Sequence, residues 1–331
     1  MEIIDVVGID VSKLTIDVVI HQSKNYRQFE NTNKGFSMLC KWALSKSKVD
    51  KDKLLFVFEH TGLYSYQVSV YLSKNKFNFS IVPGLEIKRS LGIARGKDDK
   101  IDAKKIARYG YRLRDEIRIT TLASDTIQIL KNLLTLRDRM VKQRAGYKTS
   151  LKEMKRVYPM KDNLLLFSSQ QKIISSLNTQ IVKIEKQMDK IILSNKKLKK
   201  QYNLITSITG VGSQTALYMI VTTDGFSKFK NSRNFASYCG IAPFPNVSGT
   251  SIRGKTKVST LANKKMKSLL DLAAKSAIQH NQEMKLYYNK RVEDGKSKMS
   301  TINIIRNKLL SRIFAVINRD TPYIDFIKYA A

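Results

Sequence analysis

The first twenty residues constrain the fold of this chain more than any other stretch. Residues 3–10 are mostly aliphatic and β-branched and end in Asp10; after a turn, a second such run covers residues 14–20. The pattern predicts a strand, a short turn and a second strand that alternates less cleanly. Because the first strand is mostly apolar, we expect it at the centre of a sheet, with Asp10 held rigidly at its exit. A carboxylate there is well placed to hold a metal ion, although an aspartate after a strand is also a common turn residue.

Apolar periodicity and turn signals predict the elements that follow the hairpin. In chain order we expect a strand over 26–31, a helix over 36–46, a strand over 54–59, a helix over 63–72 and a strand over 77–82. The strand over 54–59 ends in a carboxylate, Glu59, as the first strand ends in Asp10. This order is that of ribonuclease-H-like folds, a mixed α/β sheet that begins with an antiparallel hairpin.

Two more carboxylates lie at the start of a helix predicted from about Ile101. Asp99 and Asp102 are three residues apart and therefore share a helical face, where they repel unless a cation lies between them. They also suit a helix cap and first turn, which favour acids. Together with Asp10 and Glu59 they give four carboxylates at two strand ends and one helix start. Such oxygen-rich sites suit Mg²⁺, and two ions ~3.5–4 Å apart commonly clamp an in-line displacement at phosphorus.

The charge of the chain indicates a polyanionic partner. Lys and Arg outnumber Asp and Glu 60 to 27, which gives a formal net charge of +33 over 331 residues. A membrane surface would also attract this charge, but no apolar run reaches the ~20 residues of a spanning helix. The N-terminus also lacks the basic start of a signal peptide. We therefore expect nucleic acid as the partner, no membrane, and a cytoplasmic location.

The cysteines and histidines argue against a zinc site. Cys40 and Cys239 lie far apart, and the chain adds only His21, His60 and His280. Cys40 is expected to be a small core residue. Cys239 has no histidine near it in sequence, which argues against a nucleophilic role.

Three short motifs in the first third of the chain resemble a known family. They are Gly-Ile-Asp-Val-Ser-Lys at 8–13, Glu-His-Thr-Gly at 59–62, and Lys97-x-Asp99-x-x-Asp102-Ala103. In this order they resemble the acidic quartet of the insertion-sequence-110 family, transposases whose N-terminal domain is RuvC-like. The resemblance implies that Mg²⁺ is bound by four residues: Asp10, Glu59, Asp99 and Asp102. Asp98 could replace Asp99 as a ligand, but the spacing to Asp102-Ala103 favours Asp99.

The middle of the chain predicts a helical arm. Residues 124–157 form one expected helix, stopped by Pro159, and the next helix carries a heptad seam. The seam consists of Ile174, Leu177, Ile181, Ile184, Met188 and Ile191, and Leu198 continues it. Its partner is either the preceding helix, folded back antiparallel, or a second chain. We expect both, and hence a coiled-coil arm that also makes a homo-oligomer, a dimer or a tetramer. The lysines of the arm either contact nucleic acid or form a solvated face.

The segment 204–216 resembles a helix-hairpin-helix DNA-binding element. A helix is followed by Gly210-Val211-Gly212 and by a second helix that begins near Ser213. The glycines let the backbone approach a ligand closely, and the amides at a helix start can hold a phosphate. We therefore expect Gly210, Gly212 and Ser213 to contact nucleic acid, although such a turn also serves simply to join two helices.

Residues 246–255 are expected to form a flexible, basic loop rich in hydroxyls, either a linker or a loop whose Arg253 and Lys255 contact phosphates. Together with residues 235–243 it resembles the C-terminal domain of the same family, which places a serine in such a Ser-Gly loop. Carried over to this chain, that serine is Ser248. The family's usual Leu-Arg pair is Met266-Lys267 here, a departure that bears on DNA contacts.

The expected fold class is α/β plus α, in three domains. We expect a RuvC-like metal-binding domain over 1–118, a coiled-coil arm over 119–200, and a mostly helical helix-hairpin-helix and serine domain over 201–331. The resemblance implies a transposase or recombinase of an insertion sequence that attaches Ser248 to a DNA phosphodiester and later reverses the link, which conserves the bond energy. It also implies two partners: DNA, at the element ends and the target, and a structured guide RNA from the element.

Two other functions fit the residues alone. A ribonuclease-H-like nuclease or junction resolvase would need the carboxylates but not Ser248. A non-enzymatic nucleic-acid-binding protein would use the acids only as caps and turns.

Overall fold

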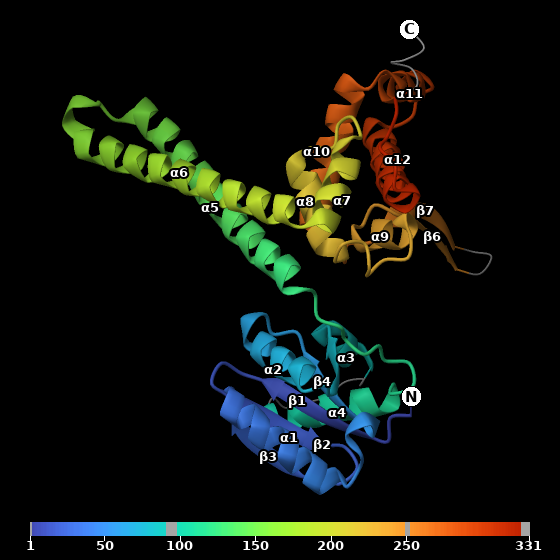
Figure 1. The fold of residues 1–331 in the computed structure, drawn as a ribbon. Helices are drawn as coiled ribbons and strands as arrows, with labels where there is room; N and C mark the ends of the chain where they lie inside the picture. The colour runs from blue at the N-terminus through green and yellow to red at the C-terminus, as the bar shows by residue number, and fades with distance from the viewer. Residues whose placement is uncertain (1, 91–97, 249–251, 326–331) are drawn as a thin grey trace. The chain divides into compact units, whose positions relative to one another are not determined.

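The computed structural model describes residues 2–90, 98–248 and 252–325 of the chain, without the side chains at 248, 252, 253 and 255. The chain divides into two compact units, Met1–Leu122 and Ala123–Ala331 (Figure 1). The sequence predicts three domains instead. The arm and the C-terminal helices fall within one unit because one hydrophobic core runs through the base of the arm and the helices beyond it.

A five-stranded mixed sheet forms the first unit, in the order β3-β2-β1-β4-β5. Its strands are β1 (Asp5–Val11), β2 (Thr15–Ile20), β3 (Tyr26–Glu30), β4 (Leu54–Glu59) and β5 (Asn78–Val82). The first three strands pair antiparallel, whereas β4 pairs parallel with both β1 and β5. As its apolar composition predicts, β1 is the central strand.

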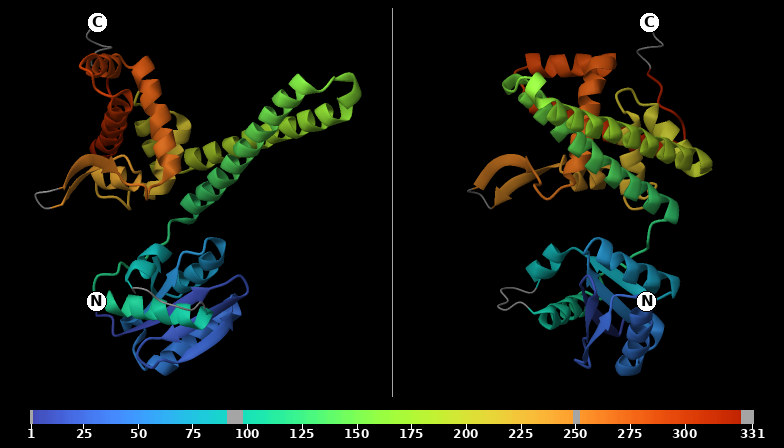
Figure 2. Two further views of the ribbon diagram at one scale, coloured as in Figure 1. Left: turned by 180° about the vertical axis from the view of Figure 1, so that it is seen from behind. Right: turned by 90° about the vertical axis from the view of Figure 1, so that its left-hand side faces the viewer.

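Helices cover both faces of this sheet (Figure 2). They are α1 (Asn33–Ser47), α2 (Leu63–Lys74), α3 (Gly84–Ser90) and α4 (Asp99–Arg112), with a short 3-10 turn, η1 (Lys51–Lys53). Alternating side chains of the strands pack on opposite faces, so that Val7 and Ile9 meet α1 and α2 while Val6 meets α3 and α4. The sequence did not predict α3, because the strand expected over 77–82 is followed by Pro83-Gly84, a pair typical of turns.

The second unit begins with a long helical hairpin, the arm. Its helices are α5 (Asp125–Val157) and α6 (Leu164–Ser194), joined through η2 (Lys161–Asn163). Ser124 caps α5, and its hydroxyl accepts the N–H of Ile127 at 3.4 Å. Most of the predicted seam is buried against α5 of the same chain, while Leu177 and Ile191 are half-buried. Leu198 lies in the next helix, since α6 ends before Asn195, which caps that helix.

The remaining helices pack around the base of the arm. They are α7 (Lys196–Thr206), α8 (Ser213–Thr223), α9 (Ser232–Tyr238), α10 (Lys264–His280), α11 (Gln282–Glu293) and α12 (Lys298–Arg319). Leu130 of α5 and Met188 of α6 share one core with Leu270 of α10 and Leu309 of α12. Of the helices in the described ranges, none is both long enough and apolar enough to cross a membrane.

The stretch expected to be a flexible loop is mostly a β-hairpin, and that expectation is wrong. β6 (Pro243–Ser248) pairs antiparallel with β7 (Ile252–Val258), with Val247 opposite Arg253. Alternating β-branched residues on β7 favour a strand despite the polar composition. Ser248 is therefore the last residue of a strand.

Candidate active site

Strand alternation brings Asp10 and Glu59 to the same face of the sheet. Gly8, two residues before Asp10, faces α4 so closely that a Cβ there would lie 2.2 Å from the backbone N of Ala107. Ile9 of β1 pairs with Phe58 of β4, so the next residues, Asp10 and Glu59, leave neighbouring parallel strands side by side. Both carboxylates therefore lie on the α4 face, at the carboxyl ends of the two central parallel strands.

Helix α4 supplies the other two predicted carboxylates. Asp99 and Asp102 lie in its first turn, the former exposed and the latter half-buried. Asp98 is the N-cap, and its Oδ1 accepts the N–H of Lys100 at 3.4 Å. Asp98 therefore has a capping role of its own. Asp102 also accepts from Lys105 Nζ at 2.7 Å, so one of the four acids has a cationic neighbour.

The acids act on one another through their charge. Burial, and after it the nearby carboxylates of Asp99, Asp102, Asp17 and Glu59, together raise the pKa of Asp10 to about 6. Among the described residues, the charged neighbours that shift this pKa are acids. A site of this kind stabilises a bound cation, and strongly perturbed acids are typical of functional sites.

Asp17, which the sequence reasoning missed, is a fifth carboxylate of this site. It lies directly opposite Asp10 in the β1–β2 pair and is almost fully buried. Its Oδ1 accepts from Tyr26 Oη at 2.6 Å, and both of its oxygens accept from Gln28 Nε2 at 3.2 Å. The signal was present in the sequence: Asp17 is the one charged residue of an apolar strand, and a tight turn fixes the register that pairs it with Asp10.

The donor set fits a hard divalent cation such as Mg²⁺. Its ligands would be the oxygens of Asp10, Glu59, Asp99 and Asp102, and hard cations prefer oxygen. The glycine at 84 leaves space for one of them, because a Cβ there would lie 2.0 Å from Glu59 Oε1. Within the described ranges, no three His, Cys, Asp or Glu side chains lie close enough to enclose a metal ion. The four carboxylates therefore concentrate negative charge at this end of the sheet, but they do not form a complete coordination shell.

The two glycines of the Gly-x-Gly turn between α7 and α8 have different surroundings. Gly210 has φ +93°, and a Cβ there would lie 2.7 Å from the backbone N of Ala277, so packing on α10 requires a glycine. Gly212 has open space around its Cβ position, and it is exposed together with Ser213 at the start of α8. Gly212 and Ser213 are thus the more accessible part of the turn, whereas Gly210 is half-buried.

The β6–β7 hairpin carries the predicted serine and basic residues. Ser248 pairs with Ile252 at the end of β6, and Arg253 and Lys255 lie on β7, but their side chains are outside the described part. Helix α12 anchors the start of the hairpin: Asn303 and Asn307 donate from Nδ2 to the carbonyl of Ile241 at 2.9 and 3.1 Å.

Cys239, just before this hairpin, is fully buried, and burial raises the pKa of its thiol to about 12. A thiol of that kind is inert as a nucleophile. The structure and the sequence therefore both argue against a nucleophilic role for Cys239.

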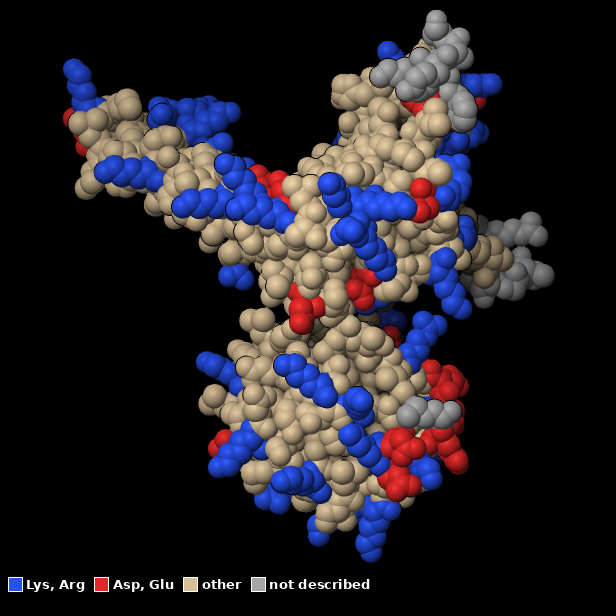
Figure 3. Space-filling view, in the orientation of Figure 1, with Lys and Arg blue, Asp and Glu red and all other residues tan. Residues whose placement is uncertain are grey.

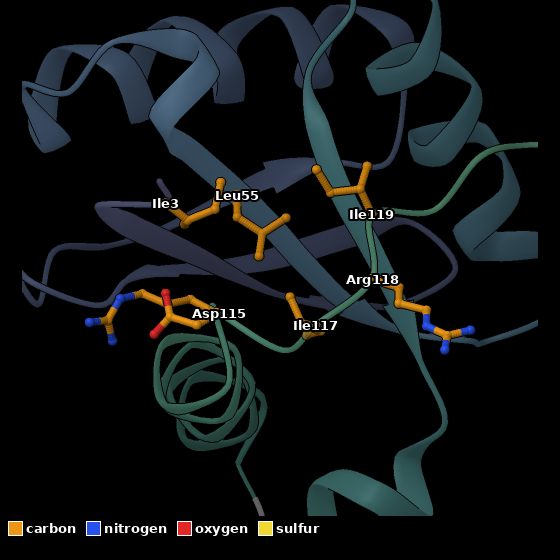
Figure 4. Close-up of a pocket in the computed structure, with 7 residues that line it drawn as sticks. Ile3, Leu55, Asp115, Ile117, Arg118 and Ile119 are labelled. Atoms are coloured by element: carbon orange, nitrogen blue, oxygen red, sulfur yellow. The ribbon is translucent and has the colours of Figure 1, made fainter. Parts of the chain in front are cut away.

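A cavity of the first unit lies away from the carboxylates. It has a volume of about 460 Å³ and is lined by Ile3, Leu55, Arg114, Asp115, Ile117, Arg118 and Ile119 (Figure 4). Ile3 precedes β1 and Leu55 lies near the start of β4, whereas Asp10 and Glu59 lie at the other ends of these strands. The cavity is therefore not part of the candidate site.

Surface charge is uneven between the two signs. On the face drawn in Figure 3, lysine and arginine side chains are spread over both units, and one group of acidic side chains lies together on the first unit while others are scattered over the second. This distribution suits a protein that attracts a polyanion broadly and holds cations at one place.

Comparison with known proteins identifies the family. Residues 7–159 match the DEDD transposase family of IS110, and residues 202–289 match the family described as transposase IS116/IS110/IS902. The pilin gene-inverting proteins of Moraxella bovis and Moraxella lacunata are each 29% identical over 324 residues, 96% of this chain and 97% of theirs. An insertion element IS110 protein of Streptomyces coelicolor is 29% identical over 120 residues, 36% of this chain and 29% of that protein. The two matched regions include all four predicted carboxylates and the serine hairpin, and the chain belongs to the IS110 family of transposases, enzymes of DNA recombination.

Proposed function

We propose that the chain cuts and rejoins DNA with a Mg²⁺-binding carboxylate site in a RuvC-like first unit and a serine nucleophile in the second. The observation that carries the proposal is the gathering of acids around Asp10, with the pKa of Asp10 raised to about 6. The sheet order and the antiparallel β1–β2–β3 start support a RuvC-like unit, since they follow the ribonuclease-H-like pattern.

In this proposal Asp10 and Glu59 hold the cation from the rigid sheet, and Asp99 and Asp102 hold it from α4. When bound, Mg²⁺ would polarise a DNA phosphate and lower the pKa of a neighbouring hydroxyl. Asp98 serves α4 as its cap, which leaves Asp99 as the better ligand.

Ser248 is the proposed nucleophile. Its Oγ forms a bond to the phosphorus of a DNA phosphodiester, one P–O bond of the backbone breaks, and the serine proton passes to the departing DNA oxygen. The reverse reaction, with a DNA hydroxyl as the attacking group, restores the serine and joins a new pair of strands. The covalent link conserves the bond, so no external energy is needed.

The proposed partners are DNA at two sites, a structured guide RNA and further copies of this chain. The net charge of +33 supports nucleic-acid partners in general. The exposed Gly212 and Ser213, and the basic residues Arg253 and Lys255, are the proposed contacts. Two nearly full-length relatives are named pilin gene-inverting proteins, which favours DNA inversion as a second candidate for the same chemistry.

Covalent adduct formation tests this proposal. Full-length protein is incubated with labelled DNA and Mg²⁺, and denaturing gels then report protein–DNA adducts. We expect an adduct with wild-type protein and none with Ser248→Ala or Asp10→Ala, while DNA binding by Ser248→Ala remains normal.

The control is Ser251→Ala, in the same hairpin connection, which should form the adduct as wild type does. An adduct with Ser248→Ala would assign the nucleophile to another hydroxyl, Ser251 first. Cutting by Ser248→Ala without any adduct would favour a nuclease or junction resolvase.

A further inference from the structure

Tyr26 of β3 makes a short hydrogen bond at the edge of the carboxylate site. Its hydroxyl donates to Asp17 Oδ1 at 2.6 Å, and Gln28, two residues further along the same strand, donates to both oxygens of Asp17. Asp17 is the acid directly opposite Asp10 on the neighbouring strand. With both oxygens engaged, the Asp17 carboxylate has a fixed orientation beside Asp10.

The same tyrosine also contacts α4. The ammonium group of Lys100 lies 4.9 Å from the centroid of the Tyr26 ring, a cation–π contact. Lys100 lies in the first turn of α4, between Asp99 and Asp102. One side chain therefore touches both β2, through the acid opposite Asp10, and the start of α4, which carries two of the predicted ligands.

The contacts are specific for a tyrosine. The ring supplies the surface for Lys100 and the hydroxyl supplies the donor for Asp17, so phenylalanine would keep the first contact and lose the second. Outer-shell groups that orient metal ligands typically change metal affinity or activity by ~10–100-fold when they are mutated.

We propose that Tyr26 is a positioning residue of the carboxylate site, which acts through Asp17 and Lys100 to hold Asp10 and the start of α4 ready for a divalent cation. The inference rests on the proposed function, because it assumes that these acids bind Mg²⁺. Tyr26 itself touches neither the cation nor DNA in this role. Asp17 adds a fixed negative charge next to Asp10, which strengthens the attraction for a divalent cation.

The test is calorimetric titration of Mn²⁺, and then Mg²⁺, into the full-length protein without DNA. Tyr26→Phe should weaken cation binding about tenfold. Adding Asp17→Asn to Tyr26→Phe should cost less than the product of the two separate losses, because the tyrosine acts through that carboxylate. The matched control is Tyr66→Phe on α2, since Tyr26 and Tyr66 are both 38% exposed. This control should bind the cation as wild type does.

A second variant keeps the proposal testable if Tyr26→Phe folds poorly. Gln28 is exposed, and Gln28→Ala should weaken cation binding about tenfold, because it removes the side chain that donates to both oxygens of Asp17. If Tyr26→Phe and Gln28→Ala bind the cation as tightly as Tyr66→Phe, the inference is wrong and the proposed function stands. If wild-type protein binds neither Mn²⁺ nor Mg²⁺, the proposed function itself fails, and this inference with it.

Discussion

One acid in each unit shows two opposite surroundings: basic side chains in the helical unit and other acids in the sheet unit. In the helical unit, Asp271 of α10 contacts Lys275 and the buried Arg306. Burial by itself would raise the pKa of Asp271, but hydrogen bonds from Arg306 and Lys275 lower it overall. In the sheet unit, burial and four other acids raise the pKa of Asp10.

Under the proposed function, the contrast separates acids that stabilise the fold from acids that bind a cation for catalysis. An acid beside a buried arginine contributes to folding, and its loss leaves a buried charge unpaired. An acid beside other acids costs stability unless a cation joins them, which is the arrangement that catalytic sites tolerate. Asp102, with Lys105 at 2.7 Å, is intermediate between the two.

The largest expected effect is on activity, in the sheet unit. Asp10→Asn should lower DNA cutting by more than ~100-fold, because loss of a direct ligand should exceed the ~10–100-fold effect of outer-shell groups. Cleavage of labelled DNA in Mg²⁺ measures it. Asp52→Asn, an exposed aspartate before β4, is the control and should cut normally. Equal activity of the two variants would remove Asp10 from the active site.

A large effect on stability is expected in the helical unit. Asp271→Asn should lower the free energy of unfolding by about 3 kcal/mol, because Arg306 is left buried without its anion. Lys275→Gln removes the exposed partner of the same carboxylate and should cost below about 1 kcal/mol. Denaturant unfolding monitored by circular dichroism compares them. Similar losses for both variants would mean that burial of the partner does not decide the cost.

A smaller effect is expected in the arm. Glu185 of α6 pairs with Arg137 of α5 at 2.7 Å, and both side chains are partly exposed. Glu185→Gln should therefore lower stability by only about 0.5–1 kcal/mol in the same unfolding experiment. A loss of stability as large as that of Asp271→Asn would contradict the expectation that a more buried ion pair contributes more.

Much of the fold followed from the sequence because its strands are strongly apolar. The central place of β1 follows from its composition, and the bounds of β4 match the expected strand over 54–59. The carboxylates Asp10 and Glu59 could be found because each ends a buried strand. Two elements were not predicted, because they depend on tertiary contacts. Helix α3 begins at Gly84, a residue type that usually ends an element, and the β6–β7 hairpin forms in a polar stretch.

The site was incompletely predicted for a different reason. The sequence shows Asp17 as a charged residue in an apolar strand, but its place beside Asp10 follows only when the register across the turn is worked out. The contact of Tyr26 with Lys100 joins residues far apart in sequence, so no local pattern reveals it. Gly210 was expected to approach a phosphate, but its Cβ position faces Ala277, and that contact depends on how α10 packs.

The central claim is that the acids around Asp10 are held for a cation at the expense of stability. Since the folded-state pKa of Asp10 is raised from 3.8 to about 6, its folded form binds a proton more tightly than its unfolded form. The charged carboxylate therefore costs stability above pH 6: a rise from 3.8 to about 6 corresponds to ~3 kcal/mol, which solvent screening of the partly exposed group reduces to on the order of 1–2 kcal/mol. The cost disappears as the pH falls toward 4.

Calorimetric unfolding of wild type and Asp10→Asn, with and without Mg²⁺, tests this claim most directly. At pH 7 without divalent cations, Asp10→Asn should raise the Tm of the sheet unit by a few degrees. The gain should shrink as the pH falls from 7 to 4. Mg²⁺ should raise the Tm of wild type but not of Asp10→Asn. A lower Tm for Asp10→Asn at pH 7, or equal stabilisation of both proteins by Mg²⁺, would contradict the account.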